Sequence, residues 1–202
     1  MNRPTVGVLA LQGDVREHLR ALAGVGADAV PVRRPGELEG LDGLILPGGE
    51  STTMAKLART FEVFEAVADR IKTGLPTFGT CAGMVLLADR LRDGAEGQET
   101  FGGLDITVRR NAFGRQVDSF EGEVAFDLDD AAFAQPVHAV FIRAPWVEEV
   151  GKDVDVLAVV DVPMVGDRIV AVQQGSVLAT SFHPEVSDDL RLHRYFMSLI
   201  TG

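Results

Sequence analysis

The first half of the chain alternates short apolar runs with segments whose apolar residues recur every three or four positions. Short runs bounded by glycine or proline are typical of buried strands, and the longer period is typical of amphipathic helices. The pattern predicts strands over Thr5–Leu11, Ala27–Val32, Leu41–Leu46 and Leu75–Thr80. It predicts helices over Asp14–Val25, Thr52–Ala58, Phe61–Lys72 and Ala82–Leu91. Ser51 is placed to cap the second of these helices.

The pattern changes after this last helix. A polar, glycine-rich stretch at 93–103 predicts a loop, and mostly strands follow it. The strands are expected over Leu104–Val108, Phe120–Phe126, Val137–Ile142, Val156–Val160, Ile169–Gln173 and Val177–Thr180. Turns are expected at Gly166-Asp167 and Gln174-Gly175. A closing helix over Asp188–Ile200 places Leu192, Phe196 and Leu199 on one face.

Strands that alternate with helices and are apolar along their length favour a parallel sheet covered on both faces. A length of 202 residues corresponds to one domain, or to one domain with a large addition. We therefore expect a single α/β domain over residues 1–202. Its architecture is predicted to be a flavodoxin-like three-layer arrangement, with a mostly parallel central sheet, helices on both faces and added β-strands in the second half.

Composition excludes several classes of function. The chain has 19 Lys and Arg against 30 Asp and Glu, a net charge of −11, which disfavours nucleic-acid binding because such a field repels phosphate. The apolar runs are too short for a membrane span or a secretory signal, so we expect a cytoplasmic protein. The only cysteine, Cys81, excludes an intrachain disulfide and argues against a structural zinc cluster.

Cys81 lies in Gly79-Thr80-Cys81-Ala82-Gly83, after a predicted strand and before a predicted helix. This is the glycine-flanked spacing of a nucleophile elbow in its expected context. The flanking glycines allow a sharp turn, and the helix N-terminus directs partial positive charge at the sulfur, which favours the reactive thiolate. A small buried core cysteine is the alternative interpretation, which the elbow spacing makes the weaker one.

His183 is the best candidate for a base. In His183-Pro184-Glu185 the proline favours an extended backbone, so the histidine and the glutamate face the same side. Glu185 can then accept a hydrogen bond from one imidazole nitrogen and leave the other for Cys81. His18 and His193 fall within predicted helices and are expected at the surface, and His138 has no carboxylate two residues further on.

An acyl-enzyme also needs donors for an oxyanion. The Ala82 N–H, directly after the nucleophile, is one natural donor. The segment Pro47-Gly48-Gly49-Glu50-Ser51 follows a predicted strand, and its glycines let backbone N–H groups approach a ligand closely. Taken alone, this segment favours a plain turn.

Together, the segments around Cys81, Gly49 and His183 resemble the motifs of class I (triad) glutamine amidotransferases. Further segments resemble, within that family, the glutaminase subunits of pyridoxal 5′-phosphate synthases: Leu11-Gln12-Gly13, Arg16-Glu17-His18, Leu46 to Met54, Asn111 to Phe120 and Phe141 to Pro145. The resemblance extends from Val6 to Glu185 and shows no departure at the triad positions. The stretches at 94–100 and 127–136 resemble ordinary variable loops.

The resemblance implies a chemistry. Cys81 would attack the side-chain amide carbon of L-glutamine, His183 would protonate the departing ammonia and then activate water, and Glu185 would orient His183. Gly49 and Ala82 would form the oxyanion hole. Contacts to L-glutamine are implied for Gly49, Glu50, Ser51, Arg110, Ile142 and Arg143. The arginines suit this role because a guanidinium binds a carboxylate through paired hydrogen bonds. No cofactor and no metal are implied.

The resemblance also implies a partner. Ammonia would pass, shielded from water, to a (β/α)8-barrel synthase subunit within a large hetero-oligomer. That subunit would make pyridoxal 5′-phosphate, a form of vitamin B6, from a pentose phosphate, a triose phosphate and ammonia. The oxyanion hole near Gly49 would be competent only when the synthase docks, on a surface expected to include Gln12 and the helix after it.

Three other functions remain open at this point. The first is a glutaminase of another pathway, such as purine, histidine or anthranilate synthesis, which would keep the same elbow and triad. The second is a cysteine-elbow stress protein or peptidase-like protein of the same broad fold, in which a histidine typically follows the nucleophile, where this chain has Ala82. The third is a binding module without catalytic activity, which the intact set of Cys81, His183 and Glu185 disfavours.

Overall fold

Parallel strands form one half of the main sheet, from one of its edges inwards. In the computed structural model, which describes residues 3–110, 119–162 and 166–202, they pair in the order β2 (Asp28–Val32), β1 (Thr5–Leu9), β3 (Gly43–Leu46), β4 (Thr77–Thr80) and β12 (Val177–Thr180). This is the strand order of flavodoxin-like sheets, which places ligand sites at the carboxyl ends of the strands. The predicted fold class, with its added strands, is confirmed.

The strands of the second half extend this sheet beyond β12. Next to β12 come β11 (Gly166–Gln174), β9 (Trp146–Val150), β6 (Leu104–Arg109) and β5 (Ala88–Arg92). All of these junctions are antiparallel except the parallel pair of β5 and β6. Off this path, β10 (Asp155–Val162) pairs with β11, and a separate hairpin is formed by β7 (Ser119–Val124) and β8 (Val137–Ile142).

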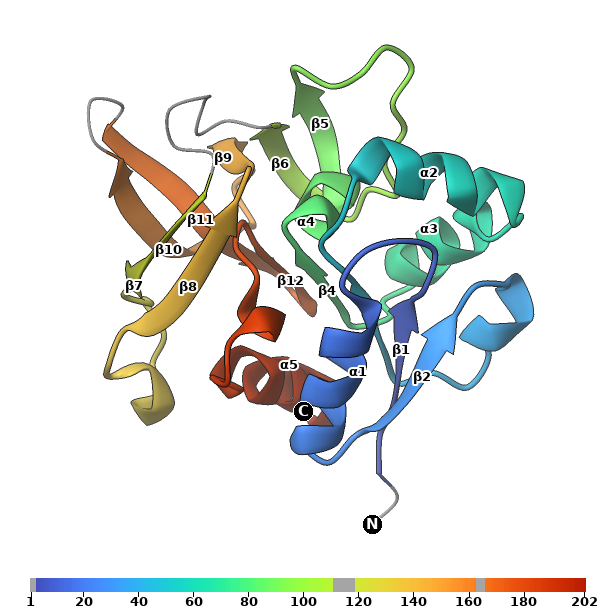
Figure 1. The fold of residues 1–202 in the computed structure, drawn as a ribbon, viewed down its shortest axis with the longest axis horizontal. Coiled ribbons are helices and arrows are strands. Elements are labelled where there is room, and N and C mark those ends of the chain that lie inside the picture. The colour runs from blue at the N-terminus through green and yellow to red at the C-terminus, as the bar shows by residue number, and fades with distance from the viewer. Residues whose placement is uncertain (1–2, 111–118, 163–165) are drawn as a thin grey trace.

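Helices cover both faces of the parallel strands. The helix α1 (Val15–Gly24) lies beside α5 (Arg191–Thr201) on one face (Figure 1). The other face carries α2 (Ser51–Thr60), α3 (Phe64–Lys72) and α4 (Ala82–Leu87). Short 3-10 turns complete the set: η1 (Pro35–Leu38), η2 (Ala131–Phe133) and η3 (Pro184–Val186). Among the described residues, no helix is both long enough and apolar enough to span a membrane.

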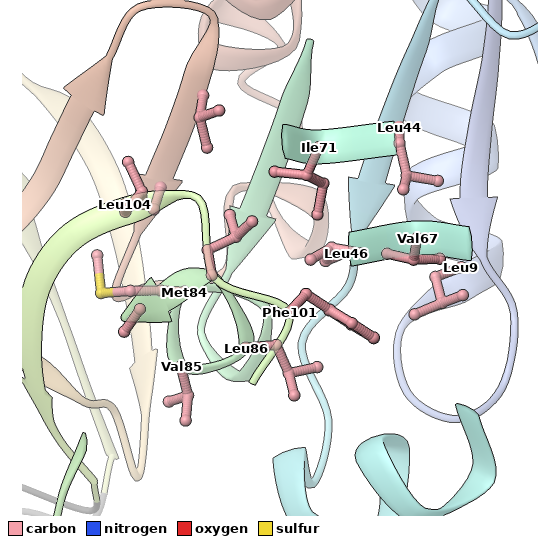
Figure 2. Packing of buried hydrophobic residues seen from close by; sticks show 14 of the residues in the cluster. Leu9, Leu44, Leu46, Val67, Ile71, Met84, Val85, Leu86, Phe101 and Leu104 are labelled. Atoms are coloured by element: carbon pink, nitrogen blue, oxygen red, sulfur yellow. The ribbon is translucent and has the colours of Figure 1, made fainter. Parts of the chain in front are cut away.

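Two apolar clusters hold the layers together. The first packs α2, α3 and α4 against the sheet, and Figure 2 shows Val67 and Ile71 of α3 beside Leu44 and Leu46 of β3. The second packs α1, α5 and the β7–β8 hairpin against the opposite face, with Phe78 of β4 fully buried in it. The inner parallel strands β1, β3, β4 and β12 are therefore buried on both sides, which explains their mostly apolar sequences, whereas the edge strand β2 is partly exposed.

Some predicted elements are wrong. The predicted helix Ala82–Leu91 ends at Leu87, and the next residues form β5, because their backbone groups pair with β6. The strand β9 was not predicted. Gly166 and Asp167 do not form a turn but pair with Val162 and Asp161 in the β10–β11 ladder. Whether such a segment forms a helix or a strand is decided by the strands available to pair with it in the folded chain, which its own sequence does not reveal.

The helix cap was also predicted incorrectly. Ser51 is the first residue of α2, and the capping residue is Glu50, whose carboxylate accepts hydrogen bonds from the N–H groups of Thr52 and Thr53 at 3.2 and 2.7 Å. A carboxylate at this position satisfies donors that the helix leaves unpaired and also interacts favourably with the helix dipole.

The helix α4 and the strand β3 approach each other very closely within the first apolar cluster. Gly83 of α4 lies so near β3 that a Cβ atom built on it would be 2.0 Å from the carbonyl oxygen of Leu46. Backbone cannot yield to a side chain as a flexible neighbour can, so any larger residue must push α4 away from β3. The glycine therefore sets the distance between the strand and the helix.

We expect Gly83→Ala to lower the free energy of unfolding by about 1–3 kcal/mol, because of this overpacking. Equilibrium urea unfolding measures the change. Gly36→Ala is the matched control, since a Cβ atom on Gly36 would meet nothing within 4 Å. Equal stability of the two variants would contradict the close packing of α4 on β3.

Candidate active site

Cys81 occupies a strained turn between β4 and α4. Its backbone has φ 48° and ψ −103°, a conformation that residues other than glycine rarely adopt. The turn is held on both sides, because the Cys81 N–H donates to the Thr180 carbonyl at 2.8 Å and its own carbonyl accepts from Val85 at 3.3 Å. A Cβ atom on Gly79 would be 2.6 Å from the backbone of Gly83. The predicted elbow and both of its glycines are thus explained by geometry.

His183 and Glu185 lie together beside this turn. The His183 Nδ1 atom is 2.8 Å from Oε1 of Glu185, and both residues are buried. The Cys81 thiol lies close enough to the imidazole to raise the pKa of His183. His183 follows β12, the strand that pairs with β4, so the carboxyl ends of two adjacent parallel strands bring the three residues together.

The charges of this group are coupled. Burial opposes the protonated form of His183, but Asp14, Cys81 and Glu185 act in the other direction and together raise the pKa of the imidazole. Burial likewise opposes ionisation of Glu185, whereas the His18 and His183 rings lower the pKa of this carboxyl group well below its usual range. An ionised carboxylate beside a protonated imidazole follows from these shifts.

Asp14 was missed in the sequence. Its Oδ2 atom lies 3.2 Å from the same His183 Nδ1 atom, so two carboxylates share one imidazole nitrogen. The available signal was its position shortly after β1, at the carboxyl edge of the parallel sheet. The ligand atoms of Asp14, His183 and Glu185 lie within 4.8 Å of one another, close enough to hold a metal ion. The hydrogen bond to Glu185 already uses the imidazole atom that such an ion would need.

A cavity of about 200 Å³ opens above the thiol. This volume suits a ligand of amino-acid size. Cys81 and Ala82 line it together with all of the predicted glutamine-binding residues, which are Gly49, Glu50, Ser51, Arg110, Ile142 and Arg143. Val85 and Pro145 complete its wall. Of the segment 111–120 that resembles the synthase glutaminases, residues 111–118 lie outside the described part of the chain.

Arg110 is held in the cavity wall by three neighbours. Its guanidinium donates to Glu50 at 2.9 Å, to the Thr52 hydroxyl at 3.0 Å and to the Gln98 side-chain oxygen at 2.5 Å. Burial raises the pKa of Glu50, but hydrogen bonds from Thr53 and Thr52 lower it to about 2, so this carboxylate is ionised. The Glu50 side chain therefore positions Arg110 as well as capping α2.

Gln98 connects two cavity residues and was not predicted. Besides accepting from Arg110, its amide nitrogen donates to the Ser51 hydroxyl at 2.9 Å. It lies in the loop between β5 and β6, in the stretch that resembles a variable loop. A lone glutamine in a polar loop carries no motif, so only the folded contacts identify it.

The β8–β9 connection supplies the opposite wall. Arg143 has φ 44°, a second left-handed backbone among the cavity residues, and its side chain is exposed. The preceding Ile142 is 40% exposed, and its carbonyl oxygen lies 3.9 Å from the Cys81 sulfur. Both predicted residues therefore border the cavity from the antiparallel part of the structure.

The glycine segment before α2 packs against the segment after β1. The Gly48 carbonyl accepts from the Asp14 N–H at 3.0 Å, and the Gln12 side chain accepts from the Glu50 N–H at 2.7 Å. A Cβ atom on Gly13 would be 1.8 Å from the Gly48 oxygen. The position of Gly49 in the cavity thus depends directly on residues 12–14.

Two histidines expected at the surface are instead fully buried. His18 of α1 and His193 of α5 each have 0% exposure, and their ring nitrogens lie 3.1 Å apart. The prediction was wrong, although a signal was present. His18 follows Val15 by three positions and precedes Leu22 by four, which puts it on the apolar face of the helix.

Comparison with known proteins identifies relatives along nearly the whole chain. A model of the SNO glutamine amidotransferase family matches residues 8–201. A protein of Nocardioides sp. named "Pyridoxal 5′-phosphate synthase subunit PdxT" is 65% identical over 198 residues, covering 98% of this chain and 96% of its own length. The protein of the same name from Acidothermus cellulolyticus is 61% identical and covers 100% of this chain and 96% of its own.

Solved structures give the same result. A crystal structure described as a glutamine amidotransferase superposes with a TM-score of 0.87 at 49% identity, covering 98% of this chain and 99% of the other. A protein of Thermoplasma acidophilum described as part of a putative GMP synthase has a TM-score of 0.69 at 18% identity, covering 100% and 96%, and so shares the fold. With a family match over nearly its whole length, the chain belongs to the SNO glutamine amidotransferase family.

Proposed function

We propose that this chain hydrolyses L-glutamine to L-glutamate and ammonia, and that the ammonia feeds the synthesis of pyridoxal 5′-phosphate. The observation that carries the proposal is the placement of Cys81 on a strained elbow, beside the buried His183–Glu185 pair and within a cavity of amino-acid size. The family match and the PdxT relatives support the choice of substrate and pathway. Residues 1–202 then act as one glutaminase domain.

The reaction begins at the Cys81 sulfur. The thiolate attacks the side-chain amide carbon of glutamine, and the C–N bond breaks as His183 gives its proton to the departing ammonia. The raised pKa of His183 keeps this proton available at neutral pH. Glu185 holds the imidazole through Nδ1, which leaves the other ring nitrogen to face the reacting atoms.

Hydrolysis of the thioester completes the cycle. His183, now neutral, takes a proton from water, and the resulting hydroxide attacks the thioester carbonyl, releasing glutamate and the Cys81 thiolate. Each step passes through an oxyanion, for which the N–H groups of Gly49 and Ala82 are the proposed donors. Both residues line the cavity.

The remaining cavity residues bind the substrate. We assign Arg110 and Arg143 to its α-carboxylate, since a planar guanidinium pairs well with a carboxylate. Glu50, Ser51 and Ile142 border the same space and complete the glutamine site. The anchoring of Arg110 by Glu50 and Gln98 limits its motion, which favours a defined substrate position.

The partner is a pyridoxal 5′-phosphate synthase subunit. We propose that it is a (β/α)8 barrel in a large hetero-oligomer in the cytoplasm, and that it joins the ammonia to a pentose phosphate and a triose phosphate. The relatives named as synthase subunits support such a partner. Docking near Gln12 would reach the oxyanion hole, because this side chain accepts from the Glu50 N–H beside Gly49.

The first test is a glutaminase assay with and without candidate synthases. We expect glutamate release to be low for the isolated chain and to rise when a pyridoxal 5′-phosphate synthase subunit is added. Cys81→Ala should lower kcat at least about 10⁴-fold, as loss of a nucleophile does elsewhere, while leaving the melting temperature and synthase binding unchanged. Mass spectrometry of wild type quenched during turnover should find a glutamyl thioester on Cys81. Activation only by an unrelated synthase would contradict the assigned pathway.

Gln98→Ala should raise KM for glutamine about 10-fold with little change in kcat, because Arg110 and Ser51 lose the side chain that holds them. Steady-state kinetics with the synthase present measures both constants. Glu99→Ala is the matched control: it lies in the same loop but pairs with Arg59 outside the cavity. An unchanged KM in the Gln98 variant would show that the loop does not support the substrate site.

Asp14→Asn should change the pH profile. The carboxylate stabilises protonated His183, so its removal lowers the pKa of the imidazole, and the acid form is lost at a lower pH. The alkaline limb of kcat/KM should move to lower pH by roughly one unit. Asp28→Asn, the same charge change at an exposed position, should leave the profile unchanged. A shift to higher pH in the Asp14 variant would refute the assigned charge coupling.

A further inference from the structure

A line of buried polar side chains continues from Glu185 into the interior of the protein. The hydroxyl of Thr80 lies 3.4 Å from Oε1 of Glu185 and 3.1 Å from Nε2 of His18. On its other side the His18 ring contacts His193, with Nδ1 of His18 3.1 Å from Nε2 of His193. The line starts at η3, crosses β4 and α1, and ends on α5.

All of these groups are sealed from water. Thr80, His18 and His193 have 0% exposure, and so does the side chain of Glu185. A buried ionised carboxylate is strongly destabilising unless neighbouring groups compensate it. The second oxygen of Glu185, Oε2, has no hydrogen bond within the described chain, and His18 Nε2 at 3.5 Å is the nitrogen placed beside it.

The donor directions follow from this arrangement. Glu185 can only accept, so the Thr80 hydroxyl donates to it and must itself accept from His18 Nε2–H. His193 Nδ1 has no hydrogen-bond partner in the described residues, and a buried lone pair without a partner is less costly than a buried N–H without one. His193 therefore carries its proton on Nε2 and donates it to Nδ1 of His18. Burial and the His18 ring lower the pKa of His193 to about 3, consistent with a neutral ring.

We propose that His18 is a positioning residue of the triad: through Thr80 it holds the Glu185 carboxylate in the orientation that presents Oε1 to His183, and His193 fixes the tautomer of His18. The proposal rests on the proposed function only for its kinetic consequences. His18 touches neither the substrate cavity nor the thiol, so its effect passes entirely through Glu185 and His183.

Kinetics of paired variants tests this role. His18→Leu removes the donor, and we expect kcat to fall about 100-fold, as small misplacements of catalytic groups do, with KM for glutamine unchanged. His18→Gln keeps an N–H near the position of Nε2 and should recover most of kcat. Thr80→Val, which removes the hydroxyl at nearly constant volume, should lower kcat in the same way and serves if His18→Leu does not fold.

The control for general loss of packing is Leu22→Ala, one turn further along the same helix and also fully buried. This variant should lose stability but keep kcat at temperatures where it is folded. If it loses kcat as much as His18→Leu at equal stability, or if His18→Gln gives no recovery, the proposal is wrong and His18 serves only packing.

A second readout does not require turnover. In ¹⁵N-labelled full-length protein, histidine side-chain spectra should show His193 protonated at Nε2, and His18→Leu should shift the Nδ1 signal of His183 while Leu22→Ala leaves it in place. A His193 proton on Nδ1, or an unmoved His183 signal, overturns the proposal. Failure of wild type to hydrolyse glutamine in the presence of the synthase would instead refute the proposed function and leave this spectroscopic result standing.

Discussion

The left-handed backbone of Cys81 is the constraint on which the rest of the site depends. A non-glycine residue in such a conformation costs about 1–3 kcal/mol and persists only where the surroundings enforce it. Here β12 fixes the N–H of Cys81 through Thr180, and the flanking glycines let α4 pack directly on β3 and β4. The turn projects the sulfur out of the sheet into the cavity rather than into the core.

The cavity is built from two parts of the chain with different architectures. The parallel strands provide Cys81 and residues 49–51 at their carboxyl ends, with His183 beside the thiol, as is usual for sheets of this order. The antiparallel extension and its connections provide Arg110, Arg143 and the loop that carries Gln98. The chemistry is therefore carried by the parallel part, whereas substrate binding draws on both parts, because Gly49, Glu50 and Ser51 follow the parallel strand β3.

The sequence predicted the parallel sheet and the residues at its carboxyl edge because both depend on local patterns. Apolar runs mark the buried strands, and glycines at fixed offsets mark the elbow. Contacts between distant segments have no such pattern: Gln98 reaches Arg110 and Ser51 only after the loop closes over α2, and β5 forms only beside β6. The burial of His18 could be predicted only in part. Helical periodicity places the residue on the apolar face, but histidine is less often buried than the aliphatic residues beside it.

The same limits apply to charge. A net charge of −11 disfavours nucleic-acid binding but could not show that carboxylates gather around one imidazole. In the folded chain Asp14 and Glu185 approach His183 from the ends of two different strands, β1 and β12. Their effect on its protonation is a property of the assembled sheet edge and of no single segment.

The solitary thiol has a practical consequence. Cys81 is the only cysteine and lies at the cavity, so a reagent that alkylates thiols modifies this protein only at the active site. The part of the label that a bound substrate analogue blocks then counts the competent sites per chain. Active-site titration, which in most enzymes requires a selective inhibitor, is available here with a simple thiol reagent.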